Sequence, residues 1–208
     1  MSSAPRALLL DAMGTLIGLH SSVGTTYATV AGQFGIRADP RNIDRAFPEL
    51  LRQAPPLAFP GLNGEALRRA EINWWGERIA AALQTDPLPS GLAEALFEHF
   101  ADPAHWRVYP EVPACLRRWR QRGLRLAVVS NFDSRLPGLL AGLELAELID
   151  AVVVSSSAGA AKPDPAPFRL ALDALGVEAP EAWHVGDSAE DEAGAAAAGL
   201  RCLLVQRP

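Results

Sequence analysis

A series of short apolar segments, each ending at a polar residue or a glycine, constrains this fold more than any other feature of the sequence. Such segments are typical of strands buried on both faces of a parallel sheet. Between the later ones, apolar residues recur at helical spacing, which gives the alternation of strand and helix found in doubly wound α/β folds. The predicted strands are residues 7–10, 124–129, 151–154, 182–185 and 202–205. The predicted helices between them are residues 112–122, 135–143, 165–175 and 189–198.

The long interval between the first two predicted strands, residues 11–123, is mostly helical in pattern. Apolar residues recur there at helical spacing in four stretches, separated in part by proline-rich breaks. These stretches are residues 22–34, 40–52, 63–84 and 89–101, and the expected caps of the last two are Asn63 and Ser90. We therefore expect an α-helical cap over residues 19–105, inserted into an α/β core made of residues 1–18 and 106–208.

The composition favours a protein that handles small molecules. At 208 residues, the chain is long enough for one α/β core with a small accessory domain. Its formal charge of -5 offers no basic surface to attract nucleic acid. Cys115 and Cys202 lie far apart, without the spacing of a disulfide framework or a zinc site. No apolar stretch approaches the length of a membrane span, and the N-terminal leucine run is too short for a signal peptide. We expect a cytoplasmic monomer or homodimer.

Polar residues follow most of the predicted strands, and in an open parallel sheet ligands bind beyond the carboxyl ends of the strands. These polar residues are Asp11, Ser130 with Asn131, Ser155 and Asp187. Lys162 lies just before the helix that leads to the fourth predicted strand, and it is the only lysine among 19 basic residues. An ammonium retained in a chain that otherwise uses arginine indicates a crowded site that a planar guanidinium does not fit.

Four segments resemble, in order, the four motifs of the haloacid dehalogenase (HAD)-like hydrolase superfamily. They are LLLDAMGTL, VVSNFD, AKPDP and HVGDSAED, and together they extend from residue 8 to residue 191. The stretch from GLRLAVVSNFDSRL through KPDP to HVGD is similar, more narrowly, to the group called HAD-like hydrolase domain-containing protein 3. The resemblance implies a Rossmann-like core with a helical cap and a small phosphorylated metabolite as the substrate.

The resemblance also implies a nucleophile and a metal site. Asp11 would attack phosphorus and form an aspartyl-phosphate, which splits one difficult step into two. Asp187 would bind Mg²⁺ together with Asp11 and the backbone carbonyl of Met13, and Asp191 would assist directly or through water. Judged without the resemblance, Asp187 could instead cap the following helix, and Asp191 could be a solvated helix residue.

The remaining roles implied by the resemblance concern the transferred phosphoryl group. Ser130 and the backbone N–H of Asn131 would bind its oxygens, and Lys162 would neutralise negative charge on the nucleophile and on the group in transit. Gly14 and Thr15 would form the tight turn that leaves the first strand. The cap would hinge near residues 16–20 and 106–110, and its closure would exclude water.

Met13 departs from the pattern of the phosphatases in this superfamily, which normally have a second Asp two residues after the nucleophile. That Asp protonates the leaving group and then activates water. Such acid–base assistance is typically worth about 10²- to 10⁴-fold. Turnover of phosphate esters is therefore expected to be slow, unless the substrate carries a good leaving group or another acid compensates.

Two other functions follow from this departure. The segment DAMGTL also resembles the DAYGTL of 2-haloacid dehalogenases, in which Asp11 would displace halide without a metal and Arg37 or Arg41 would bind the substrate carboxylate. Asp187 argues against this function because a carboxylate is an unfavourable neighbour for an anionic substrate. The third possibility is a binding or regulatory protein that keeps the fold and has lost turnover.

Three further residues receive simpler interpretations. Trp74 is expected in the core of the cap, and His184 is expected to be a packed imidazole within the fourth predicted strand. His20 follows the first motif, where the cap would hinge, and it is a weaker candidate for a contact with substrate.

Overall fold

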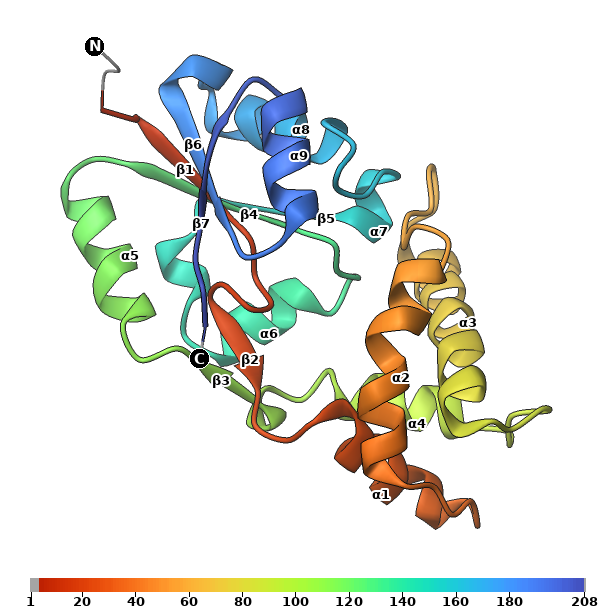
Figure 1. Ribbon diagram of the computed structural model, residues 1–208. Coiled ribbons are helices and arrows are strands. Elements are labelled where there is room, and N and C mark those ends of the chain that lie inside the picture. Colours follow the sequence, from red (N-terminus) through yellow and green to blue (C-terminus); the bar gives the residue numbers. More distant parts are fainter. Residues whose placement is uncertain (1–3, 208) are drawn as a thin grey trace.

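The computed structural model describes residues 4–207 and contains a parallel sheet of five strands in the order β5-β4-β1-β6-β7 (Figure 1). The central strand is therefore the first in the chain, and the later strands are added on both of its sides. The strands are β1 Ala7–Leu10, β4 Arg125–Ser130, β5 Ala151–Val154, β6 Ala182–Gly186 and β7 Arg201–Leu204. This arrangement confirms the predicted doubly wound α/β core.

Helices cover both faces of the sheet, and the side chains of each strand alternate between them. Leu8 and Leu10 of β1 pack with helices α5 and α6, whereas Ala7 and Leu9 pack with α8 and α9. These helices are α5 Val112–Gln121, α6 Leu136–Gly142, α8 Ala166–Leu175 and α9 Ala189–Ala197. Leu9 and Leu10, which point to opposite faces of the sheet, are both fully buried. Each contributes about 1.5–3 kcal/mol to stability, which fixes β1 at the centre of the core.

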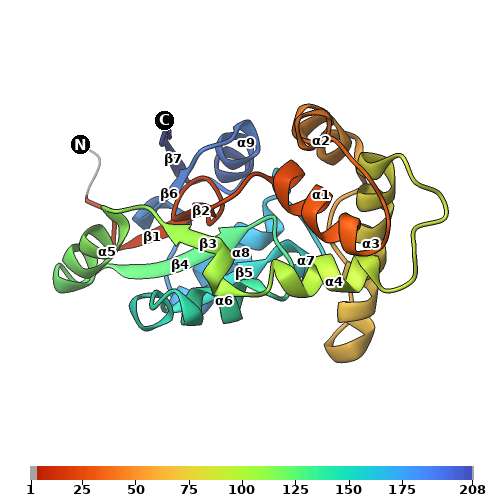
Figure 2. The same cartoon turned by 90° about the horizontal axis from the view of Figure 1, so that it is seen from below.

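Four helices lie between the first strand of the sheet and the second, as the spacing of apolar residues predicted. They are α1 Val23–Gln33, α2 Pro40–Gln53, α3 Gly64–Leu83 and α4 Leu92–His99. These four, called the cap helices below, gather to one side of the sheet and share an apolar cluster of their own that includes Tyr27, Ile43 and Ile79 (Figures 1 and 2). The limits of a separate cap domain at residues 19 and 105 remain a prediction.

A short antiparallel ribbon connects the cap helices to the core. It consists of β2 Ile17–Leu19 and β3 Trp106–Val108, with Ile17 opposite Val108. The chain thus enters and leaves the cap helices through two adjacent strands. The ribbon falls within the two segments in which a hinge was predicted, although no strands were predicted there.

Some local predictions were wrong. Helix α4 begins at Leu92 after Gly91, whose φ of 83° is left-handed, so Ser90 is not its cap. Asn63 does precede α3, but its side chain caps no backbone N–H. Trp74 is not a core residue: it is only partly buried, and its indole N–H donates to the carbonyl of Pro55 at 3.0 Å. Helix α8 begins at Ala166, and the Asp164 carboxylate accepts its first backbone N–H at 2.8 Å.

The remaining elements are short. They are helix α7 Ser155–Ala158 and the 3₁₀ helices η1 Pro103–His105, η2 Ala146–Leu148 and η3 Ala179–Glu181. Within residues 4–207, no helix combines the length and the apolar character that crossing a bilayer requires.

Candidate active site

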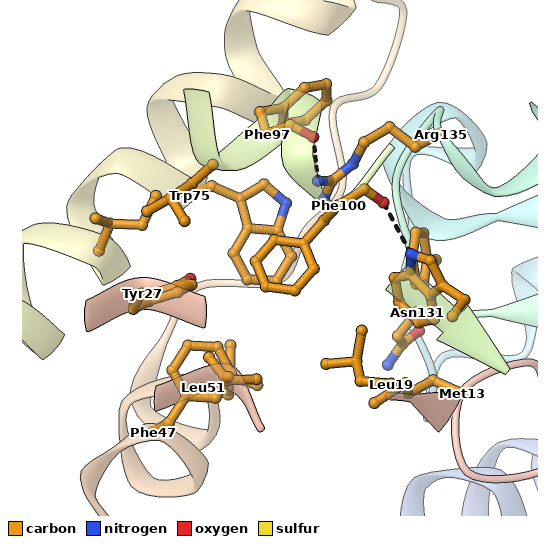
Figure 3. Close-up of a pocket in the computed structure, with 15 residues that line it drawn as sticks. Met13, Leu19, Tyr27, Phe47, Leu51, Trp75, Phe97, Phe100, Asn131 and Arg135 are labelled. Carbon is orange, nitrogen blue, oxygen red and sulfur yellow. Dashed lines mark hydrogen bonds between the residues drawn. The ribbon is translucent and has the colours of Figure 1, made fainter. Parts of the chain in front are cut away.

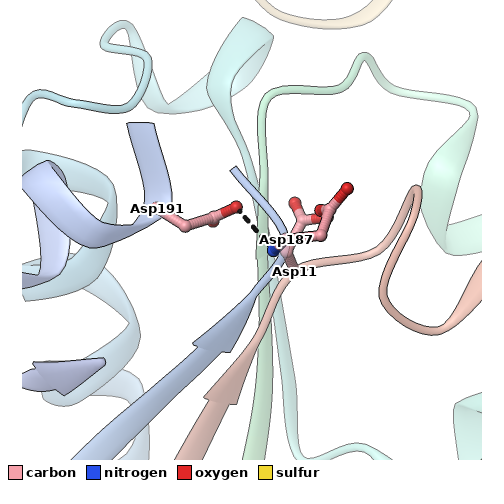
Figure 4. Close-up of side chains that lie close together, drawn as sticks. All are labelled: Asp11, Asp187 and Asp191. Atoms are coloured by element: carbon pink, nitrogen blue, oxygen red, sulfur yellow. Dashed lines mark hydrogen bonds between the residues drawn. The ribbon is translucent and has the colours of Figure 1, made fainter. Parts of the chain in front are cut away.

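The predicted site residues at the carboxyl ends of β1, β4 and β6 lie side by side. These three strands are adjacent in the sheet, and neighbouring strands are about 4.8 Å apart. Asp11 follows β1, Ser130 ends β4, and Asp187 follows β6. Helix α9 turns back over the end of β6 and brings in Asp191, so that carboxylate oxygens of the three aspartates lie within 4.8 Å of one another (Figure 4).

Asp11 has one oxygen engaged and one free. Its Oδ1 accepts a hydrogen bond from the Ser130 hydroxyl at 3.0 Å and another from the Lys162 ammonium at 2.6 Å. Its Oδ2 accepts none from the part of the chain that the structure describes, although the residue is only 5% exposed. Burial raises the pKa of the Asp11 carboxyl, Lys162 opposes this shift, and the negative charge of Asp191 adds to it. The residue thus presents a single unpartnered carboxylate oxygen.

Lys162 connects the first strand to the last helix of the core. Its buried ammonium donates to Asp11 Oδ1 and Asp191 Oδ1, both at 2.6 Å, and to the carbonyl of Val129 at 3.1 Å. Burial alone would lower the pKa of this ammonium, but the charges of the two aspartates raise it above its usual value. The ammonium therefore stays protonated at neutral pH and compensates one buried negative charge.

The side chain of Asn131 holds the backbone of Lys162 in place. Its amide N–H donates to the Lys162 carbonyl at 2.9 Å, and its carbonyl accepts from the Lys162 N–H at 2.7 Å. This pair of hydrogen bonds crosses from the end of β4 to the loop before α8. The sequence predicted only the backbone N–H of Asn131 as a functional group and missed this use of its side chain.

Asp191 is fully buried and saturated with hydrogen bonds, so a solvated helix residue was the wrong alternative for it. Its Oδ1 contacts Lys162 and also His184 Nε2 at 2.7 Å. Its Oδ2 accepts from the Ser188 hydroxyl at 2.6 Å and from the backbone N–H groups of Ser188 and Asp187 at 3.1 and 3.2 Å. Burial would raise the pKa of Asp191, but these partners, His184 and Lys162 first, lower it below its usual value.

His184 is buried within β6, as predicted, but the sequence did not reveal its contact with Asp191. Because the ionised carboxylate can only accept, Nε2 of His184 carries the proton in this contact. Its Nδ1 has no hydrogen-bond partner among the described residues. The neutral tautomer with the proton on Nε2 fits both observations. The sequence feature that could have indicated this contact is the position of His184, two residues before the Gly-Asp pair of the last motif.

Gly14 lets the turn after β1 approach Asp187 closely. Its φ is +84°, and a Cβ atom at this position would lie 2.2 Å from Asp187 Oδ2, so any side chain would displace the carboxylate. The next residue, Thr15, donates its hydroxyl to Asp187 Oδ1 at 3.3 Å. Gly14 and Thr15 thus form the predicted tight turn and also position Asp187. Burial raises the pKa of Asp187, and the charges of Asp11 and Asp191 raise it further.

The charges of this cluster fit a divalent cation. Three carboxylates, those of Asp11, Asp187 and Asp191, face the single ammonium of Lys162, which leaves two formal negative charges uncompensated. Carboxylate oxygens are ligands that Mg²⁺ prefers, and a bound cation relieves repulsion between like charges. Asp187 and Asp11 are the residues best placed to supply ligand oxygens, because both oxygens of Asp191 already accept several hydrogen bonds.

Comparison with known proteins agrees with this arrangement. A model of the haloacid dehalogenase-like hydrolase family matches residues 5–199. The chain belongs to this hydrolase family. It is 37% identical over 210 residues to the HAD-like hydrolase domain-containing protein 3 of Bos taurus, covering 98% of this chain and 82% of the relative. It is also 46% identical over 205 residues to a phosphoglycolate phosphatase of Rhodospirillum rubrum, covering 97% of this chain and 79% of the relative.

Among solved structures, this hydrolase is similar in fold to CbbY from Rhodobacter sphaeroides, determined in complex with phosphate. The TM-score is 0.71 at 23% sequence identity, with 98% of this chain and 87% of the other covered. The common fold extends over the core and the cap helices.

A cavity of about 180 Å³ opens beside the carboxylate cluster of this hydrolase, between the cap helices and the loop after β4 (Figure 3). Met13, with 42% of its surface exposed, and Asn131 line the edge nearest the cluster. Arg135 is the arginine in its wall. Arg37 and Arg41 are both exposed, and neither lines the cavity.

Other polar residues singled out from the sequence lie away from the cluster. Ser155, at the end of β5, is buried and donates its hydroxyl to the carbonyls of Leu57 and Phe132 at 2.7 and 3.2 Å. His20 lines a second cavity together with His99 and His105. The order of the strands explains why Ser155 lies away from the cluster, because β5 is an edge strand and lies two strands from β1.

Proposed function

We propose that this HAD-family hydrolase is a Mg²⁺-dependent phosphatase of a small phosphorylated molecule and that it forms an aspartyl-phosphate on Asp11. The observation that carries the proposal is the free Oδ2 of Asp11 beside Asp187, while its Oδ1 is held by Ser130 and Lys162. The similarity to a phosphoglycolate phosphatase supports the reaction class. A cytoplasmic location is part of the proposal, since Cys115 and Cys202 are both free thiols.

In the first step, Oδ2 of Asp11 forms a bond to phosphorus, and the bond from phosphorus to the ester oxygen breaks. Lys162 and Ser130 stay on Oδ1, which fixes the direction of the attacking oxygen. The positive charge of Lys162 and the N–H of Asn131 offset the charge that spreads over the phosphoryl oxygens. When bound, Mg²⁺ supplies further charge neutralisation and aligns the phosphoryl group. Asp11, Asp187 and the carbonyl of Met13 would hold it.

Asp191 acts as a positioning residue in this scheme. With both of its oxygens occupied by hydrogen bonds, it fixes Lys162 on one side and the backbone of Asp187 on the other. Any contact of Asp191 with the cation would then be through a water molecule. Partners of this kind around metal ligands are typically worth about 10- to 100-fold in metal affinity or activity.

Met13 supplies no proton to the leaving group, and it activates no water in the second step. We therefore expect hydrolysis of alkyl phosphates to be slower by about 10²- to 10⁴-fold than with an acid at this position. Asp11, Lys162 and Ser130 remain in hydrogen-bond contact, and this arrangement argues against a protein that has lost all turnover. The exposed positions of Arg37 and Arg41, together with the presence of Asp187, argue against a dehalogenase.

The test is a paired assay of the purified protein with 4-nitrophenyl phosphate and with 2-chloropropionate, each with Mg²⁺ and with a chelator. Phosphate release that needs Mg²⁺ and disappears in Asp11→Asn is the expected result. Chloride release that is insensitive to the chelator would instead support the dehalogenase function. Release of neither phosphate nor chloride would support a binding or regulatory protein without turnover.

A further inference from the structure

The cavity beside Met13 is walled by aromatic and aliphatic side chains. Figure 3 shows rings from the cap helices, among them Tyr27, Phe47 and Trp75, facing the end of the sheet. Met13 lies two residues after the nucleophile and Asn131 directly follows Ser130. A group attached to a phosphoryl at Asp11 would therefore extend over Met13 into this apolar space.

The polar side chains in the wall are occupied by the protein itself. The indole N–H of Trp75 donates to Asp133 at 2.7 Å, and that of Trp106 donates to the carbonyl of Phe100 at 3.1 Å. The side-chain amide of Asn131 is engaged by the backbone of Lys162. Neither indole N–H is left to recognise a polar substituent, and the Asn131 amide keeps only one of its two N–H donors.

The only charged side chain in the wall, Arg135, is neutralised by a buried partner. Its guanidinium donates to both oxygens of Asp133, at 2.7 and 2.5 Å, and to the carbonyl of Phe97 at 2.9 Å. It also stacks on the ring of Phe97, 3.9 Å from the centroid. A carboxylate entering the cavity would have to compete with Asp133. The Tyr27 hydroxyl is the one polar side-chain group of the lining for which the described residues provide no hydrogen-bond partner.

The volume of the cavity matches a single aromatic ring. A dry apolar cavity of about 150 Å³ binds benzene, and this one measures about 180 Å³. Burying a charged carboxylate or ammonium group in such a space without a partner costs several kcal/mol, whereas a ring is stabilised by contacts with other rings.

We infer that the leaving group of the substrate is an uncharged phenol of about one ring, so that the substrate is an aryl phosphate monoester. This inference rests on the proposed phosphatase function. Met13 supports it independently, because a phenol ionises near pKa 10 whereas water does so near 15.7. As the bond from Asp11 to phosphorus forms, the electron pair of the breaking bond stays on the phenolate oxygen. The phenolate then takes a proton from solvent, so no acid is needed at position 13.

A matched pair of substrates tests the inference. 4-Methylphenyl phosphate and phosphotyrosine share the same ring and a similar phenol acidity, but phosphotyrosine adds an ammonium and a carboxylate. With Mg²⁺ present, we expect kcat/KM to be at least about tenfold higher for 4-methylphenyl phosphate. It should exceed that for phosphoglycolate by a larger factor. Equal or higher values for phosphotyrosine or phosphoglycolate would overturn the inference.

A pair of variants links the preference to the cavity. Leu51 lines the cavity and is 37% exposed, so Leu51→Arg introduces a free cation there without burying it fully. Leu62 is 40% exposed and lies outside the cavity, so Leu62→Arg is the control. We expect the ratio of kcat/KM for 4-methylphenyl phosphate to that for phosphoglycolate to fall about tenfold in Leu51→Arg only. An unchanged ratio in both correctly folded variants would contradict the assignment.

The failure of this inference can be told apart from the failure of the proposed function. Beryllium fluoride mimics a phosphoryl group and has no leaving group to occupy the cavity. ¹⁹F NMR with Mg²⁺ and beryllium fluoride should give a bound signal in the native protein and none in Asp11→Asn. If the signal forms and the aryl preference is absent, only the inference on the leaving group fails. If the signal does not form, the phosphatase function itself fails.

Discussion

Glu71 of helix α3 accepts two hydrogen bonds from Ser134, one from the backbone N–H at 2.9 Å and one from the hydroxyl at 2.5 Å. Trp75, one turn further along the same face of α3, donates to Asp133, and Arg135 donates to the carbonyl of Phe97 in α4. Three successive residues after β4 therefore bind the cap helices. The structure represents the docked position of these helices, with the cavity formed between them and the core.

Glu71→Ala should weaken this docking. Hydrogen bonds to a charged group are worth about 1.5–3 kcal/mol, and the variant also leaves the N–H of Ser134 without this partner. We expect the free energy of unfolding in urea to fall by about 2 kcal/mol and KM for aryl phosphates to rise. The control is Glu77→Ala on the same helix, because the Glu77 side chain is 74% exposed and its partner, the buried Arg78 guanidinium, also donates to the Trp74 carbonyl. Equal losses in the two variants would count against the docking contact.

Lys162→Met should abolish phosphatase activity and destabilise the fold. Removing one partner from a buried ion pair typically costs about 3–5 kcal/mol, since Asp11 and Asp191 are left as buried charges. Lys162→Arg should not restore activity, because its planar guanidinium cannot take the place of the ammonium between the two carboxylates. Chemical denaturation and phosphate release measure the two effects. Full activity in Lys162→Arg would contradict the claim that only an ammonium group fits this position.

His184→Phe should weaken Mg²⁺ binding by about 10- to 100-fold, because Asp191 loses a hydrogen bond that positions it. The substitution keeps an aromatic ring next to Phe168, whose ring lies 4.9 Å from that of His184. Calorimetric titration with Mg²⁺ measures the affinity. The control is Trp183→Phe, which alters the opposite face of the same strand. An unchanged affinity in His184→Phe would show that His184 is only a packing residue.

Met13→Asp should accelerate alkyl phosphates more than aryl phosphates, since a proton donor helps most when the leaving group is a strong base. We expect an increase in kcat of about 10²-fold or more for phosphoglycolate and a smaller one for 4-methylphenyl phosphate. Met13→Asn has a similar shape but no acid, and it should give neither increase. If the aspartate and asparagine variants behave alike, a missing acid is not what limits turnover.

Much of the site could be predicted because it depends on the order of strands in the sheet. Asp11, Ser130 and Asp187 each end or follow a strand, and the carboxyl ends of parallel strands meet at one edge. The place of Lys162 in the site could be predicted because it is the only lysine in the sequence. Each of these predictions needed only local sequence patterns and the general topology of doubly wound folds.

The contacts that could not be predicted join elements placed by tertiary packing. The pairing of Trp75 with Asp133 spans 58 positions in the chain and depends on how α3 docks on the core. The same uncertainty made Trp74 a false candidate for the core, because adjacent residues of a helix differ by about 100° in direction. The β2–β3 ribbon was missed since strands of three residues carry too little alternation to recognise.

The isolation of Lys162 has a practical consequence for labelling experiments. Reagents that acylate lysine side chains find a single ε-amine in this chain, and in the folded protein it is buried, protonated and paired with two carboxylates. Acylation of this amine therefore requires the surrounding structure to open. The rate at which the peptide containing Lys162 gains the acyl group thus measures how often the carboxylate cluster becomes accessible to solvent, without interference from surface lysines.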